Sequence, residues 1–336
     1  MRDPDADRCI GPAMLPARTM EHRMAHGNPV GTPVSVPRIR SRAGSVIAFP
    51  AGNVTCLGFA DRAFDRTAFR VLLAHDLTGQ SEIALVRAAR LALEREGHLT
   101  IVHVVDSALP APVIEARREK AKRQVEAEVR RWLGRRALSH RIEIAVGDPA
   151  GAIVARAQAR NVDLVVTGRH QRHALAAMFG LSTIGQLLQR VRRPLLAVGS
   201  PNQSPYRRVL VPIDGGEASA ARVELAAALL PGAGLHLLWP ENPSAADRVA
   251  IAPSFPALGG RRPILTRASG DAPSLVRKEL ARQKTDLLVL GPNAPSGMTH
   301  ALFGSADEAI LRASPCDVLF VPPTRAQCEA SEAARS

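Results

Sequence analysis

The segment 147–198 occurs twice in this chain, and its second copy, 270–321, aligns with it without a gap. Each copy reads as a Gly-Asp turn, a helix, an apolar strand that begins at an Asp and ends at a Gly, a polar loop, a helix that begins at a Ser, and a last apolar strand. Self-similarity over this length indicates two copies of one structural unit. Function is expected where the strand that ends at Gly168 or Gly291 passes into its polar loop.

Strands and helices alternate along the first copy. Its strands are expected at 70–76, 99–105, 141–146, 163–167 and 195–198. Its helices are expected at 81–96, 113–133, 150–160 and 182–191. The alternation predicts a parallel sheet with right-handed crossovers and helices on both faces. The alternating pattern of 141–146 is typical of a strand at a sheet edge or of one that is half covered.

The second copy opens with the strand 208–214, followed by a helix at 219–229 and a strand at 234–239. It is shorter than the first copy where that copy has its long charged helix. Five prolines occupy the corresponding stretch, namely Pro240, Pro243, Pro253, Pro256 and Pro263. Proline disfavours regular helix, so the helix here is expected to be shortened or replaced by a loop.

These patterns divide the chain into four parts. Residues 1–68 lack sustained periodicity and are expected to be a mostly irregular extension. Residues 69–200 form domain 1, and residues 206–323 form domain 2, with a short polar linker between them. Residues 324–336 are a polar tail.

Composition narrows the class of protein. The chain has 336 residues, of which 46% are hydrophobic, enough for two globular domains with sizeable cores. No apolar run is long enough to span a membrane, and the acidic start does not resemble a secretory signal, so a cytoplasmic location is expected. None of the four cysteines is paired at metal or redox spacing, and Cys316 reads as a small buried hydrophobe.

A net charge of +13 raises the question of a nucleic-acid partner. The basic residues are spread over helices that also carry Glu, and the chain has a single tyrosine for stacking on bases. No helix-turn-helix pattern accompanies them. These features favour a solvated surface over nucleic-acid binding.

The ordered set of motifs resembles the universal stress protein family, and the chain resembles a tandem member of it over residues 69–323. The resemblance rests on the strand that ends in Asp, the Gly-Asp turn, the Asp-strand-Gly segment and the Ser that enters the last helix. It implies two tandem doubly wound five-stranded parallel sheets of Rossmann-like, adenine nucleotide α-hydrolase-like fold. It also implies that some members bind ATP through Gly-x-x-Gly, nine residues, and then Gly-Ser or Gly-Thr.

Domain 2 keeps more of that phosphate cradle than domain 1. It retains Gly291, Gly297 and the pair Gly304-Ser305, although Ala294 replaces the middle glycine. Glycines let the backbone approach phosphate, and a helix N-terminus offers free N–H groups to an anion. We expect a candidate ATP or adenine-nucleotide site here, with Asp214 facing the adenosine part; alternatively, the glycines only make tight turns.

Domain 1 has Gln171 at the position of the second glycine and Leu181-Ser182 in place of Gly-Ser. Its weaker candidates are Asp76, Gly168 and Ser182. The site is therefore expected to be degenerate. The basic residues after Gly168 could hold an anion, but a solvated loop is favoured; they are Arg169, His170, Arg172 and His173.

For the other polar residues a structural role is a simpler interpretation than a ligand-binding one. Asp76 and Asp214 could orient adenine or could cap the loop after the first strand. Asp148 and Asp271 follow Gly and precede helices, so N-capping is favoured. Three histidines on or beside strands are expected to pack in the core or at an edge rather than bind metal: His75, His103 and His236. No nucleophile-base-orienter set is visible, so no catalytic residue and no metal ligand is assigned.

The last strand of each copy, 195–198 and 318–321, would be an exposed apolar edge. Such an edge promotes aggregation unless it is paired. Family members commonly pair this strand across a two-fold axis, so we expect the two strands to pair antiparallel within the chain.

The resemblance, together with the missing catalytic set, thus implies a non-catalytic stress-response protein with an unidentified protein partner. One alternative is a purely structural interaction module without nucleotide, which Gln171, Leu181 and Ala294 favour. The other is a weak nucleotide hydrolase of the wider fold group, which the missing catalytic set argues against.

Overall fold

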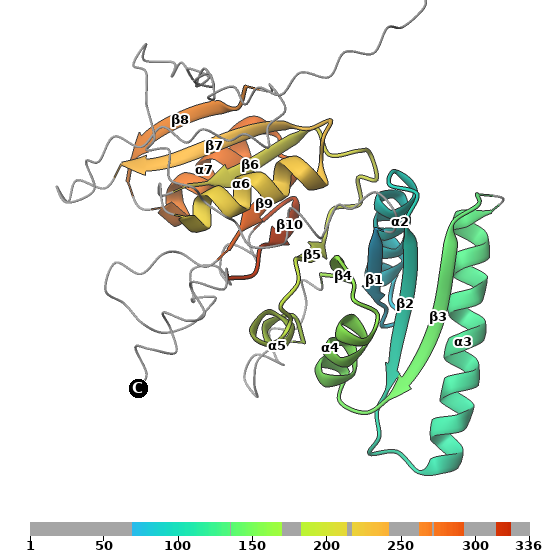
Figure 1. Cartoon of the computed structure of the whole chain (residues 1–336). Coiled ribbons are helices and arrows are strands. Elements are labelled where there is room, and N and C mark those ends of the chain that lie inside the picture. The colour runs from blue at the N-terminus through green and yellow to red at the C-terminus, as the bar shows by residue number, and fades with distance from the viewer. Residues whose placement is uncertain are drawn as a thin grey trace, which may run out of the picture. The chain divides into compact units, whose positions relative to one another are not determined.

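The computed structural model describes residues 69–134, 136–169, 183–213, 217–241, 262–270, 272–291 and 314–323 (Figure 1). The predicted extension 1–68, the tail 324–336 and the proline-rich stretch between the second and third strands of domain 2 lie outside these ranges, apart from Pro240 and Pro263.

Domain 1 alternates five strands with four helices in the predicted order. Its strands are β1 (Arg70–Ala74), β2 (His98–Val105), β3 (Ser139–Val146), β4 (Leu164–Gly168) and β5 (Leu195–Val198). Its helices are α2 (Gly79–Leu93), α3 (Ala111–Leu133), α4 (Pro149–Ala159) and α5 (Thr183–Arg190).

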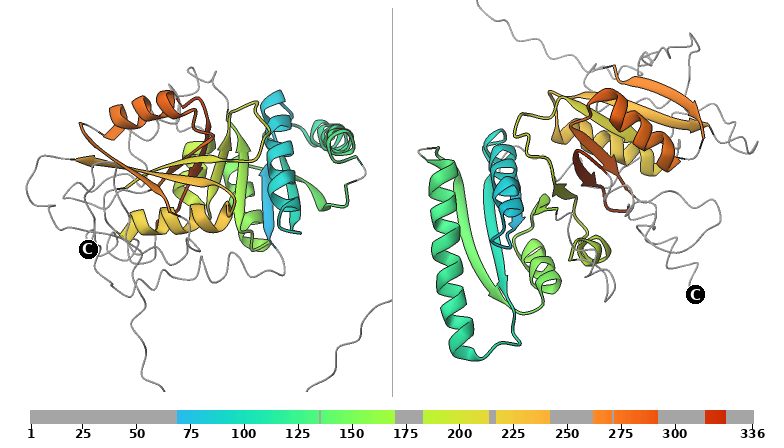
Figure 2. Two further views of the ribbon diagram at one scale, coloured as in Figure 1. Left: turned by 90° about the horizontal axis from the view of Figure 1, so that it is seen from above. Right: turned by 180° about the vertical axis from the view of Figure 1, so that it is seen from behind.

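The described part of domain 2 follows the same plan. Its strands are β6 (Arg208–Pro212), β7 (Gly234–Glu241), β8 (Ile264–Ser269), β9 (Leu287–Leu290) and β10 (Asp317–Phe320). Its helices are α6 (Glu217–Leu229) and α7 (Ala272–Gln283). Figure 2 shows α6 and α7 on opposite faces of the strands of this domain.

The strands form one sheet in the order β3-β2-β1-β4-β5-β10-β9-β6-β7-β8. Every neighbouring pair is parallel except β5 and β10, which are antiparallel. This order confirms the doubly wound α/β fold in both halves. It also confirms that β3 is an edge strand and that the two terminal strands pair with each other.

The strand order shows where the switch point of each half lies. In domain 1 the chain runs outward from β1 to β3 and returns to β4 on the other side of β1. Domain 2 repeats this with β6 at its centre and β9 as the return strand. Ligands of such sheets bind beyond the carboxyl ends of the strands where the order reverses, which here lie between β1 and β4 and between β6 and β9.

Hydrophobic side chains alternate between the two faces of the sheet and form two layers of core. Leu73 and Val166 pack with α2 and α3 on one face, whereas Leu72 and Val165 pack with α4 and α5 on the other. Because the strands are covered on both faces, their residues read as continuous apolar runs.

Both copies of the Gly-Asp turn begin in the same unusual conformation. Gly147 has a φ of 137° and Gly270 a φ of 140°, a region that favours glycine. The Asp148 side chain then accepts a hydrogen bond from the backbone N–H of Gly151 at 2.7 Å and caps α4. This confirms the predicted N-cap; its counterpart Asp271 lies outside the described residues.

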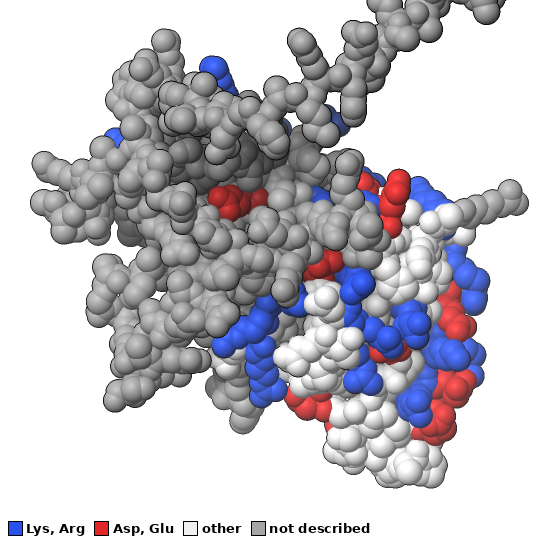
Figure 3. Space-filling view, in the orientation of Figure 1, with Lys and Arg blue, Asp and Glu red and all other residues white. Residues whose placement is uncertain are grey.

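Charged residues on α3 are mostly paired along the helix. Three arginines lie within 4.0 Å of an acid three or four residues earlier, namely Arg118 with Glu115, Arg123 with Glu119 and Arg130 with Glu126. Figure 3 shows basic and acidic side chains interspersed along this part of domain 1. The pairing is consistent with a solvated surface, and the prediction against nucleic-acid binding stays a prediction.

Replacing the α4 cap should measure its contribution to stability. Asp148→Ala removes the acceptor for Gly151 N–H, so the free energy of unfolding in urea should fall by about 1 kcal/mol. Asp148 also lies 3.3 Å from the exposed Arg190. Arg190→Gln is therefore the control and should change stability by less than about 0.5 kcal/mol; an equal loss in both variants would assign the effect to the ion pair.

Candidate functional site

The switch point of domain 1 brings Asp76 and Gly168 to one edge of the sheet. β1 and β4 are direct neighbours, with Ala74 opposite Thr167, so the residues that follow each strand emerge side by side. Sequence reasoning placed both residues in the weaker nucleotide site, and the fold does bring them together.

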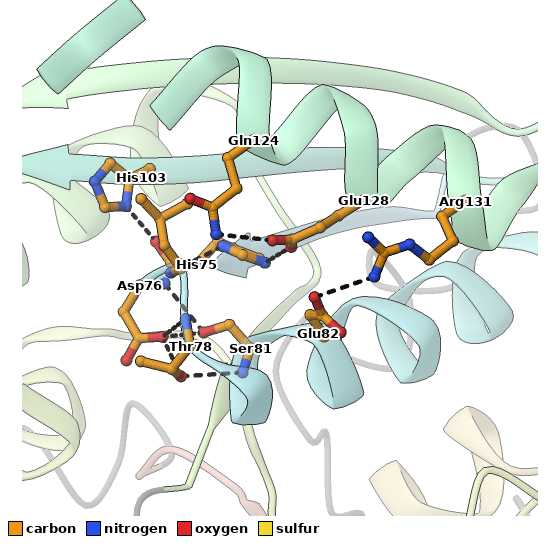
Figure 4. Close-up of polar contacts among 10 residues, drawn as sticks. His75, Asp76, Thr78, Ser81, Glu82, His103, Gln124, Glu128 and Arg131 are labelled. Carbon is orange, nitrogen blue, oxygen red and sulfur yellow. Dashed lines mark hydrogen bonds and ion pairs between the residues drawn. The ribbon is translucent and has the colours of Figure 1, made fainter. Parts of the chain in front are cut away.

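Asp76 directs its carboxylate at the chain that follows it (Figure 4). Its Oδ1 accepts hydrogen bonds from the Thr78 backbone N–H at 3.1 Å and from the Thr78 hydroxyl at 2.6 Å. The Ser81 hydroxyl also donates to Oδ1. Thr78 is itself the N-cap of α2. Of the two roles considered for Asp76, the structure supports that of organising the loop after β1.

Gly168 is packed against the first turn of α2. A Cβ at this position would lie 2.9 Å from the backbone carbonyl of Gln80 and 3.1 Å from the amide nitrogen of Ser81. No side chain fits in that space. The glycine is therefore required for helix packing, and the space beside it in domain 1 is filled by the protein's own backbone.

Arg169 is buried, with 4% of its surface exposed. Its guanidinium lies over Gly199, where a Cβ would come within 2.3 Å of Nη2, and Nη2 donates to the Ser314 carbonyl at 2.8 Å. The prediction of a solvated loop is therefore wrong for Arg169, because its side chain turns inward along the end of β5. His170, Arg172 and His173 lie outside the described residues, as do Gln171 and Ser182.

The switch point of domain 2 is framed by β6 and β9, which pair through Val209 with Leu287 and Leu210 with Leu288. Gly291 follows β9. A Cβ on it would lie 3.1 Å from the Val321 carbonyl oxygen and 3.2 Å from Cδ of Arg222, so the site favours a residue without a side chain.

Arg222 from α6 reaches this switch point, and sequence reasoning missed it. Only 3% of the residue is exposed. It donates from Nη2 to the Ser219 hydroxyl at 2.8 Å and from Nη1 to the Gly291 carbonyl at 3.5 Å. The matching residue of domain 1 is Ala84, so an arginine in place of an alanine on a buried helix face was the available signal.

The remaining candidates of domain 2 are Asp214, Ala294, Gly297, Gly304 and Ser305. All of them lie outside the described residues. Their role in a nucleotide site stays a prediction.

A buried polar cluster lies behind the Asp76 loop (Figure 4). His75 Nδ1 accepts a hydrogen bond from the Leu77 backbone N–H at 3.1 Å, so the neutral ring carries its proton on Nε2. Nε2 lies 2.9 Å from Oε2 of Glu128 on α3, and Gln124 donates to Oε1 of the same carboxylate at 3.1 Å. Both ring nitrogens are engaged, so His75 has no free nitrogen to act as a base.

His103, His236 and Cys316 lie in positions that fit the packing roles predicted for them. His103 contacts the His75 carbonyl oxygen at 2.8 Å, and His236 contacts the Thr266 hydroxyl at 2.8 Å. Among the described residues no cluster of His, Cys, Asp and Glu could hold a metal ion. Cys316 is buried, and desolvation raises the pKa of its thiol to about 11, which keeps it protonated.

Two doubly wound halves with matching switch points define a tandem α/β protein of the adenine nucleotide α-hydrolase-like fold. The model of the universal stress protein family matches this chain twice, over residues 68–199 and 205–322. The chain therefore belongs to the universal stress protein family, as a tandem member.

Solved structures show the same fold at low identity. A universal stress protein from Archaeoglobus fulgidus matches with a TM-score of 0.62 and 17% identity, covering 76% of this chain and 99% of that one. A putative universal stress protein from Pseudomonas aeruginosa matches with a TM-score of 0.55 and 19% identity, covering 81% and 99%. No curated protein matches the chain.

None of the helices in the described ranges is both long and apolar enough to cross a membrane.

The environment of His75 predicts a pH dependence of stability. Burial, the largest cause, lowers its pKa from 6.5 to about 4. The unfolded chain therefore binds the proton more readily than the folded one. The stabilising contribution is complete above about pH 6.5 and is lost as the pH falls toward 4, by up to about 3 kcal/mol.

This prediction is checked with a histidine-resolved NMR titration and with urea unfolding at pH 7 and pH 4.5. His75→Gln should show a smaller loss of stability between these two values than the wild type. A His75 ring that titrates near pH 6.5 in the folded protein would contradict the prediction.

Proposed function

We propose that this chain is a non-catalytic stress-response protein that binds an adenine nucleotide, such as ATP, in domain 2, while domain 1 does not. Membership of the universal stress protein family supports the stress-response role. The nucleotide assignment is the finer part of the proposal, together with a cytoplasmic location and an unidentified protein partner.

The observation that carries the nucleotide assignment is the adjacency of β6 and β9. β6 ends at Pro212 and β9 at Leu290, so the chain leaves both strands at one switch point; Asp214 and Gly291 come shortly after them in the sequence. In this fold, ligands bind in the crevice at that point. Gly297, Gly304 and Ser305 follow Gly291 in the sequence, where the resemblance implies the phosphate-binding loop.

Domain 1 has an equivalent switch point between β1 and β4, but its own groups occupy it. The Asp76 carboxylate is engaged by Thr78 and Ser81, and the first turn of α2 packs against Gly168. Arg169 fills the space over Gly199. A nucleotide would have to displace these contacts, which argues for a single site per chain.

Arg222 supports an anionic ligand in domain 2. Its buried guanidinium ends beside Gly291, at the edge where the phosphates would lie. A cation held in a partly desolvated site interacts strongly with phosphate oxygens. Domain 1 has Ala84 at the same position and so lacks this charge.

The two alternative functions would give different results when ATP is added. A pure interaction module would show no binding at millimolar ATP. A nucleotide hydrolase would release ADP during incubation with ATP and magnesium, and His75 offers no base for it because both ring nitrogens are engaged.

A matched pair of tryptophan variants tests the proposed site. Isothermal titration of the wild type with ATP should show one site per chain. Gly304→Trp should abolish binding, because an indole would fill the predicted phosphate cradle. Leu181→Trp changes the aligned position of domain 1 and should leave the affinity unchanged. Loss of binding in Leu181→Trp alone would move the site to domain 1.

The contribution of Arg222 can be measured separately. Arg222→Ala installs the residue that domain 1 carries at this position. The affinity for ATP should fall by about tenfold, the effect of one charge-assisted contact, while the affinity for adenosine should change much less. An equal loss for ATP and adenosine would show that Arg222 only holds Gly291 in place.

A further inference from the structure

The antiparallel pairing of β5 with β10 is centred on two equivalent residues of the repeat. Leu319 lies opposite Leu196, which is its own counterpart in the repeat, and Val318 lies opposite Ala197. The pseudo-two-fold axis therefore passes through this pair. Backbone pairing alone would allow β10 to meet either β5 or the β10 of a second chain with the same register.

Asp317 breaks this symmetry. It begins β10 and is completely buried. Its Oδ1 accepts hydrogen bonds from the backbone N–H of Gly199 at 2.9 Å and of Ser200 at 2.8 Å, the two residues that follow β5. A carboxylate that is buried this deeply requires such donors.

The second oxygen of Asp317 is also occupied. The Tyr206 hydroxyl donates to Oδ2 at 2.6 Å, and Nε of Arg87 on α2 lies 3.4 Å away. Burial, with the nearby Asp317 carboxylate, raises the Tyr206 pKa well above its usual value, so the phenol keeps the proton that it donates.

Arg87 extends the cluster into the linker. It lies over the Tyr206 ring at 4.1 Å and donates to the carbonyl oxygens of Ser204, at 2.7 Å, and Asn202. Arg87, the end of β5 and Tyr206 thus converge on the Asp317 carboxylate, and Arg87 joins the linker to this cluster.

Asp317 and the two N–H donors after β5 have no equivalents at the matching positions of the other copy. The counterpart of Asp317 is Pro194, and the counterparts of Gly199 and Ser200 are Pro322 and Pro323. Proline has no backbone N–H to donate. Two paired β10 strands would therefore bury two Asp317 carboxylates against prolines, and two paired β5 strands would leave the Gly199 and Ser200 N–H groups without this acceptor.

We propose that Asp317 is a specificity residue that restricts the β10 edge to pairing with the β5 edge of domain 1 and excludes pairing with the β10 of a second copy. The two N–H groups after β5 are the feature it recognises. Pairing of two domain 2 edges is disfavoured by the buried carboxylate, in the way that buried polar residues select register and partner elsewhere.

The full-length variants Ser200→Pro and Ser200→Ala test whether Asp317 recognises the backbone N–H groups that follow β5. Both variants lose the hydroxyl that accepts from Asn202 N–H, but only proline removes the N–H that Asp317 accepts. Hydrogen exchange of β5 and β10 should be at least about tenfold faster in Ser200→Pro than in Ser200→Ala, which should resemble the wild type. Equal exchange in the two variants would overturn the proposal.

Moving the backbone N–H donors from domain 1 to domain 2 tests whether Asp317 restricts the pairing partner of β10. Pro322→Gly with Pro323→Ser, added to Ser200→Pro, gives domain 2 the donor pair and leaves domain 1 without one of its donors. Sedimentation over a range of concentrations should show dimers for this triple variant and none for Ser200→Pro alone. Dimerisation of Ser200→Pro by itself, or no dimer in the triple variant, would overturn the proposal.

Asp317→Val provides an independent measurement should Ser200→Pro not fold. It removes the buried charge and keeps a residue suited to a strand. Faster exchange of β5 and β10 together with concentration-dependent dimers supports the proposal, whereas exchange and mass equal to the wild type overturn it.

Discussion

The antiparallel pairing of β5 with β10 is the interaction on which the rest of the molecule depends, because it joins two five-stranded halves into one sheet. Both strands are fully buried and, apart from Asp317, apolar, and either one alone would expose a row of unpaired backbone groups. Pairing removes both edges at once. The strands left at the ends of the sheet, β3 and β8, carry mostly exposed or half-buried residues, as edge strands in contact with water do.

The two halves share a scaffold but differ in the chemistry at its switch points. Each has a buried arginine near the carboxyl ends of its last two strands, yet Arg169 comes from the loop after β4 and Arg222 comes from α6. The first reaches across to the Ser314 carbonyl, and the second stays beside Gly291. Duplication has therefore kept the strands and the glycine turns while the side chains over the crevices have diverged, which is why we propose a ligand for one half only.

Much of the fold could be predicted because it follows from local patterns that the repeat shows twice. Apolar runs, the Gly147 turn and the Asp148 cap each carry a signal within a few residues. The candidate site was less predictable, because a charged residue within an apolar pattern is expected in solvent. Its burial is explained only by hydrogen-bond partners that are far away in the sequence. Arg169 was expected in solvent for this reason, and neither Arg222 nor Asp317 was singled out. Comparing the copies offered the missing signal, with Arg222 against Ala84 and Asp317 against Pro194.

The strand pairing at Leu196 and Leu319 also bears on how the chain loses its structure. Opening either half removes a neighbour from the last strand of the other half and uncovers the Asp317 carboxylate together with Arg87. The energetic cost of melting one repeat is thus shared by both. We therefore expect two repeats that look like separate modules in the sequence to unfold as one cooperative unit. Heating should then produce a single calorimetric transition whose enthalpy belongs to the whole tandem.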